Sequence, residues 1–125
     1  MRTAVTIALF CAGGGLARYY LSGWIYSLAG REFPWGTLAV NVIGAFCIGV
    51  VMELGMRGTL LPETLRVGIA VGFLGGLTTF STFSYETFTL LRDGQFLAAF
   101  ANVLVSVLIC LLCTWLGIVT VRSLT

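Results

Sequence analysis

The run from Val67 to Leu91 constrains the fold of this chain more than any other stretch. It carries a single charged residue, Glu86, and it exceeds the roughly 20 residues that cross a bilayer as a helix. Its middle is not uniformly aliphatic, because Gly75 and Gly76 are followed by five Ser or Thr residues and two phenylalanines. Gly, Ser and Thr weaken a helix, and opened backbone at membrane depth needs protein or a watery cavity around it. The sequence therefore predicts a broken helix that lines a polar space.

Composition places the whole chain in the membrane. Of its 125 residues 58% are hydrophobic and 10% are charged, and the mean hydropathy is +1.02. A soluble domain of this size cannot bury that much apolar surface. We predict an all-α membrane protein with a single domain over residues 1–125 and four spans, at about 3–28, 35–52, 65–91 and 95–121. The apolar N-terminus resembles a signal peptide but lacks a small-x-small cleavage site, so we interpret it as the first span.

Several classes of protein are disfavoured by the same composition. The seven arginines are scattered and form no basic run, so nothing indicates a nucleic-acid partner. The chain has no His, the commonest general base and metal ligand, and no nucleophile–base pair is apparent, so we predict no enzyme activity. Cys110 and Cys113 have metal-like spacing but no second pair, and we interpret all four cysteines as buried small residues.

The distribution of arginines gives only a weak preference for one orientation. Four spans place both termini and the second loop on one side of the membrane. That side carries four arginines, Arg2, Arg57, Arg66 and Arg122. The other side carries Arg31 and Arg92, with Arg18 on the border. Such a small excess does not fix the orientation. Four short helices are also few for enclosing a pore. Both observations predict a dimer, of two oppositely oriented copies.

Two polar residues in the first two spans each allow two interpretations. Arg18 lies inside the first span beside Tyr19 and Tyr20. It either snorkels to the interface with these aromatic residues or supplies positive charge at the mouth of an anion path. Asn41 is the one strongly polar residue of the second span. It either clasps a neighbouring helix or donates its N–H groups to an anion.

The third span combines a glycine stripe with an aromatic pair and a carboxylate. Gly68, Gly72 and Gly76 recur every four residues, which lets another helix pack closely against that face. Phe80 and Phe83 follow the break. Aromatic residues on one face of a helix most often only pack against neighbouring helices. Glu86 is a lone carboxylate at membrane depth and therefore a functional candidate.

The fourth span carries four polar residues on one helix face, which we call the polar track: Asn102, Ser106, Cys110 and Thr114. Single Ser and Thr residues commonly bond back to their own helix. Their regular spacing favours a track along a pathway.

These features together resemble the small fluoride channels of the Fluc, or CrcB, family. The resemblance covers essentially the whole chain. It rests on Gly13-Gly14-Gly15 with Arg18-Tyr19, on GTLAVNVIG from Gly36, on GFLGGLTTFSTFS from Gly72 with Glu86, and on the polar track.

The resemblance implies an antiparallel homodimer with two anion pores and a structural sodium ion at the dimer centre. By position in the motif, the sodium ligands are the backbone carbonyls of Gly75 and Thr78. The pore residues are Asn41, Phe80 and Phe83, the fourth-span face is the family's polar track, and Arg18 is the vestibule arginine. Asn102 and Cys110 depart from the Tyr and Ser expected in the family.

We therefore expect passive, selective fluoride export across the bacterial inner membrane, which relieves fluoride toxicity. Fluoride would replace its water with the N–H of Asn41, the hydroxyls of Ser81 and Thr82, and the polar track, with phenylalanine edges facing the ion. Two alternatives remain, a small proton-coupled dual-topology exporter that uses Glu86 and a non-transporting membrane scaffold.

Overall fold

The computed structural model describes residues 1–58 and 61–125, and all regular secondary structure in these residues is helical. The elements are α1 (Arg2–Ala29), α2 (Trp35–Met56), α3 (Glu63–Val67), the π-helix η1 (Gly68–Phe73), α4 (Leu74–Leu77), α5 (Phe80–Arg92) and α6 (Phe96–Leu124). Four stretches are long and apolar enough to cross a membrane, namely α1, α2, the combined run Glu63–Arg92 and α6. The prediction of an all-helical, four-span protein is confirmed.

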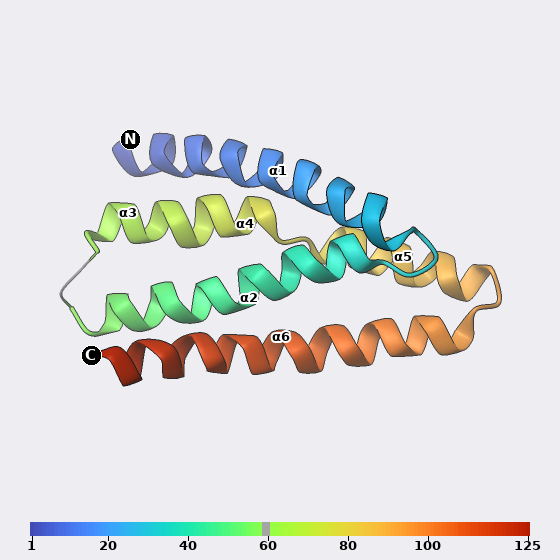
Figure 1. The fold of residues 1–125 in the computed structure, drawn as a ribbon. Helices are drawn as coiled ribbons and strands as arrows, with labels where there is room; N and C mark the ends of the chain where they lie inside the picture. Colours follow the sequence, from blue (N-terminus) through green and yellow to red (C-terminus); the bar gives the residue numbers. More distant parts are fainter. Residues whose placement is uncertain (59–60) are drawn as a thin grey trace.

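The helices lie side by side along one direction (Figure 1). Both termini, the C-terminal end of α2 and the start of α3 lie at one end of the molecule, and the α1–α2 and α5–α6 turns lie at the other. Gly30 and Gly94 adopt φ values of 82° and 76° in these two turns, a conformation that glycine adopts without steric cost. Helix α2 crosses beside the break in the third span, so that α2, α4, α5 and α6 can all contribute to one site.

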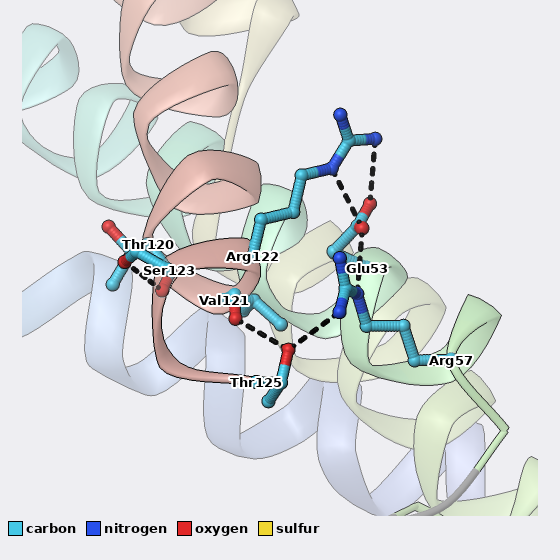
Figure 2. Close-up of polar contacts among 7 residues, drawn as sticks. All are labelled: Glu53, Arg57, Thr120, Val121, Arg122, Ser123 and Thr125. Atoms are coloured by element: carbon cyan, nitrogen blue, oxygen red, sulfur yellow. Dashed lines mark hydrogen bonds and ion pairs between the residues drawn. The ribbon is translucent and has the colours of Figure 1, made fainter.

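Helix α2 extends beyond the predicted end of its span at Met52 and continues to Met56. The sequence suggested an end there because Glu53 is charged. The carboxylate of Glu53 is instead only 7% exposed and accepts hydrogen bonds from Arg57 Nε at 3.1 Å and from Arg122 Nε at 2.9 Å (Figure 2). Arg57 also donates to Thr125 Oγ1 at 2.8 Å. This cluster ties α2 to the C-terminal end of α6.

The third span is broken after Leu77, as the glycines and hydroxyl residues predicted. Thr78 and Thr79 are extended, with φ and ψ of −86° and 154° and of −151° and 111°. A new helix, α5, begins at Phe80, and the Thr79 hydroxyl caps it by accepting from the N–H of Thr82 at 3.1 Å. The preceding π-helix η1 was not foreseen. Such segments frequently occur at functional sites.

The glycine stripe of the third span packs closely against another helix, as predicted, and the structure shows that this helix is α1. A Cβ added at Gly76 would lie 2.6 Å from the Cys11 carbonyl oxygen, and one at Gly72 would lie 2.7 Å from Phe10 Cβ. On the facing helix, a Cβ at Gly14 would overlap the Phe73 carbonyl oxygen. The two backbones therefore approach so closely that no side chain fits between them, which is the typical packing of membrane helices.

Candidate functional site

The break leaves backbone groups that a continuous helix would have paired. In such a helix the N–H of Thr79 would donate to the Gly75 carbonyl, but it donates to Asn41 Oδ1 at 2.8 Å. The N–H of Thr82 would donate to the Thr78 carbonyl, but it donates to the Thr79 hydroxyl. The carbonyls of Gly75 and Thr78 are thus released from their usual intrahelical partners.

Asn41 holds the break open. Its Nδ2 donates to the Thr79 carbonyl at 3.2 Å while its Oδ1 accepts from the Thr79 N–H. The amide therefore pairs with one residue's backbone as a neighbouring peptide group would. Of the two interpretations of Asn41, the interhelical clasp is present in the structure. The amide nitrogen carries a second N–H that the Thr79 bond does not use.

Arg18 points inward to the break rather than outward to the membrane surface. Its Nη1 lies 3.3 Å from the Thr78 carbonyl oxygen and donates to it. This contact spans 60 residues of sequence and places the guanidinium on the inner side of α1. The positive charge therefore lies next to the opened backbone.

A polar cavity of about 450 Å³ extends along this side of the break. We call it the vestibule, and its lining residues come from α1, α2, α5 and the α1–α2 turn: Gly15, Arg18, Tyr19, Ser22, Tyr26, Arg31, Thr37, Val40, Thr79, Thr82 and Glu86. Two arginines and one carboxylate give it a positive balance, which favours anions.

Glu86 lies in this vestibule with hydroxyl partners from two other helices. Tyr26 donates to one carboxylate oxygen and Thr37 donates to the other. The Arg31 guanidinium lies 4.8 Å from the centre of the Tyr26 ring, close enough for a cation–π contact. The carboxylate is therefore held by donors, and it also connects α5 to α1 and α2.

A second cavity, also of about 450 Å³, lies on the other side of the break and is mostly apolar. We call it the groove. It is lined by Asn41, Gly44, Ala45, Ile48, Ala70, Leu74, Gly75, Thr78, Thr79, Phe80, Phe83, Ser106, Val107, Cys110 and Thr114. The two phenylalanines and three members of the polar track therefore share one cavity with the opened backbone.

The phenylalanines begin α5 at the edge of the groove. The ring centres of Phe80 and Phe83 are 5.4 Å apart and inclined at 48°. Phe80 is 79% exposed in the single chain, and Ser81, Thr82 and Ser84 are exposed as well. A wide aromatic ring and three hydroxyls thus project from the half-helix that follows the break.

The four residues of the polar track do not have the same surroundings. Ser106, Cys110 and Thr114 line the groove. Thr114 donates to its own helix at Cys110 and also contacts the Ala45 carbonyl of α2, at 3.0 Å in each case. Asn102 is outside the lining of the groove and is 1% exposed, and its Nδ2 donates to Thr87 Oγ1 at 2.8 Å.

Sequence reasoning missed four residues of this site: Tyr26, Thr37, Thr79 and Thr87. Thr37 and Thr79 lie within the motifs that were singled out, but nothing indicated their partners. Tyr26 has no local signal, because its role follows from contacts 11 and 60 residues away along the chain.

Together these observations define a small four-span membrane protein in which a broken helix lies between a positively charged vestibule and a groove lined by phenylalanines and hydroxyls. The family model described as CrcB-like protein, Camphor Resistance (CrcB), matches residues 5–118. The chain belongs to this family.

Close relatives match over nearly the whole chain. The chain is 76% identical to a protein of Trichlorobacter lovleyi over 99% of both sequences. It is 71% identical to one of Pelobacter propionicus, over 99% of this chain and 96% of the relative. It is 65% identical to one of Geobacter metallireducens, over 99% of this chain and the whole relative. Each of the three is named fluoride-specific ion channel FluC.

Proposed function

We propose that this chain is a fluoride-selective channel that lets fluoride leave the cell passively across the inner membrane. The observation that carries the proposal is the placement of two cavities at the break, where Thr79 lines both of them. Arg18 lies in the vestibule, and Asn41, Phe80 and Phe83 line the groove. The names of the relatives support fluoride as the ion.

Fluoride is small and strongly hydrated, so a pore must replace its water with hydrogen-bond donors and still release it. The unused N–H of Asn41 and the hydroxyls of Ser81 and Thr82 are such donors. On α6, the hydroxyl of Ser106 and the weaker S–H of Cys110 line the groove. The positive edges of the Phe80 and Phe83 rings suit an anion that passes along them.

The conducting unit we propose is an antiparallel homodimer. The 79% exposure of Phe80 and the exposed hydroxyls of Ser81, Thr82 and Ser84 support it, because polar groups at membrane depth need protein or water around them. A second copy that covers the groove would enclose these groups. It would also place the polar track of one copy near the phenylalanines of the other.

A sodium ion at the centre of this dimer fits the released backbone. Hard cations take oxygen ligands, and the Gly75 and Thr78 carbonyls have lost their intrahelical donors to Asn41 and Thr79. Two copies would offer four such oxygens. The Arg18 contact at 3.3 Å uses one lone pair of the Thr78 oxygen and leaves the other for the ion. The ion would stabilise the break and join the copies.

The transport test is anion efflux from liposomes that contain the purified protein, with fluoride compared to chloride. We expect fluoride efflux without chloride efflux, and loss of that efflux in Phe80→Ile. Phe88→Ile is the matched control, because Phe88 is on the same half-helix, is 63% exposed and does not line the groove. Equal chloride efflux in the wild type would contradict selectivity, and unchanged efflux in Phe80→Ile would contradict the assigned pore.

The sodium site is tested by the stability of the purified protein rather than by its transport. We expect a higher melting temperature in sodium chloride than in choline chloride, because a bound ion stabilises the folded form by mass action. Gly44→Ala is expected to reduce this difference, since the added Cβ would collide with Thr78 Cγ2 and displace the ligand carbonyl. A melting temperature that is the same in both salts would argue against a sodium site.

A further inference from the structure

Asn102 departs from the residue expected at its position in the family and also lies outside the lining of the groove. It is 1% exposed and, with Val40, is one of the two largest fully buried side chains among the described residues. A polar side chain at that depth must be hydrogen-bonded to be tolerated. Its partners therefore indicate what it does.

Asn102 is the centre of a short buried chain of hydrogen bonds. Ser106 donates to its Oδ1 at 3.3 Å, and its Nδ2 donates to Thr87 Oγ1 at 2.8 Å. Thr87 in turn donates to the Phe83 carbonyl at 2.7 Å. The chain runs from a groove-lining hydroxyl on α6 to the backbone of a groove-lining phenylalanine on α5.

The half-helix α5 has few other attachments of this kind. The Asn41–Thr79 bonds hold its start to α2, and the contacts of Glu86 with Tyr26 and Thr37 hold its vestibule side to α1 and α2. Among the described residues, Asn102–Thr87 is the side-chain hydrogen bond that joins α5 to α6. It therefore fixes α5 against the helix that carries the polar track.

We propose that Asn102 is a positioning residue that acts through Thr87 to set the separation between Phe83 and the polar track. In this chain Asn102 thus holds the wall of the pathway instead of contacting the ion. Its loss would let α5 move away from α6 and widen the groove, so that a larger halide could enter. The measurement of ion selectivity described next rests on the proposed fluoride conduction.

The test compares Thr87→Val with Thr87→Ser in liposomes. Valine keeps the shape of threonine but removes the hydroxyl, so the buried Asn102 amide loses its acceptor, whereas serine keeps it. We expect an approximately tenfold fall in the fluoride-to-chloride flux ratio for Thr87→Val, the order expected when a buried donor loses its partner, and a near-normal ratio for Thr87→Ser. Equal ratios in both variants, in a wild type that conducts fluoride, would overturn the proposal.

A double variant, Asn102→Leu with Thr87→Val, separates positioning from stability. Replacing both partners with apolar groups leaves no buried polar group unpaired, so we expect normal folding together with a lowered flux ratio. Normal folding with a normal ratio would overturn the proposal, and so would failure of both valine variants to fold, because the pair would then serve stability alone.

Amide hydrogen exchange of residues 80–92 in detergent gives a readout that does not depend on transport. We expect faster exchange in Thr87→Val and in the double variant than in Thr87→Ser. If the wild type conducts no fluoride, the proposed function fails, but the hydrogen-exchange measurement still decides whether Asn102 holds α5. Unchanged exchange in the double variant would overturn the proposal that Asn102 holds α5 against α6.

Discussion

At the scale of single residues, polar side chains of the spans bond either to their own helix or to another helix. Among the described residues, no buried side-chain nitrogen or oxygen lacks a hydrogen-bond partner. Glu86 is the clearest case, because the hydroxyls of Tyr26 and Thr37 reach its two oxygens. A carboxylate held in this way connects three helices, which gives Glu86 a role that requires no proton transport.

Glu86→Gln separates the channel from a proton-coupled exporter. Glutamine keeps one acceptor oxygen and replaces the other with an amide that can donate to a hydroxyl oxygen, so both contacts can persist without the charge of the carboxylate. We expect fluoride efflux to remain within about tenfold of the wild type, the scale by which a hydrogen bond weakens when its charged partner becomes neutral, and to need no proton gradient. The measurement is efflux from liposomes with a potassium ionophore, with and without a protonophore.

The control for this comparison is Glu32→Gln, which changes an exposed carboxylate in the α1–α2 turn. Complete loss of transport in Glu86→Gln, combined with movement of protons alongside the substrate in the wild type, would instead identify an exporter that uses this carboxylate. Retained efflux without proton movement would leave Glu86 as a helix connector.

At the scale of elements, the first half of the third span depends on its contact with α1. Gly14→Ala is expected to lower the stability of the folded protein by about 1–3 kcal/mol, the usual effect of overpacking, because the new Cβ would overlap the Phe73 carbonyl. Gly23→Ala is the matched control on the same helix, since a Cβ there has no atom within 4 Å. Thermal unfolding in detergent measures both variants, and equal melting temperatures would contradict this packing.

The sequence allowed these elements, but not all of their contacts, to be predicted. Glycine spacing and a run of hydroxyl residues have direct local consequences, so a close helix contact and a break in the third span were predictable, but the partner helix α1 was not. The π-helix η1 has no comparable signature. The spacing of the polar track showed a shared helix face, but only the fold shows that Asn102 meets Thr87 while Cys110 meets the groove.

The partners of Glu86 were not predictable for the same reason. Tyr26 and Thr37 are 60 and 49 residues away along the chain, and they come together only through the packing of α1 and α2 against α5. A lone carboxylate at membrane depth looks equally suited to proton transport and to structural bonding. Its surroundings, which the sequence does not encode locally, distinguish the two.

At the scale of the whole molecule, the two ends differ little in their number of arginines. The end with both termini has four, of which Arg57 and Arg122 share the buried carboxylate of Glu53. At the other end, Arg92 is paired with Asp93 at 3.4 Å, and Arg31 contacts the Tyr26 ring. The excess of Lys and Arg on one side determines insertion, and acidic residues contribute little. The small difference in arginine number between the two ends therefore supports the proposal that both orientations form.

The antiparallel dimer can be tested by shifting that balance in opposite directions. Glu32→Lys with Asp93→Lys adds positive charge at the end with the two tight turns, and Glu63→Lys with Thr64→Lys adds it at the other end, all at exposed positions. Each variant alone should insert in one orientation and lose most fluoride efflux from cells, because no oppositely oriented partner forms. Expressed together, the two variants should restore efflux, since one copy of each makes an antiparallel pair. Full efflux from either variant alone, with its orientation shown to be uniform by cysteine labelling, would mean that the conducting unit is not antiparallel.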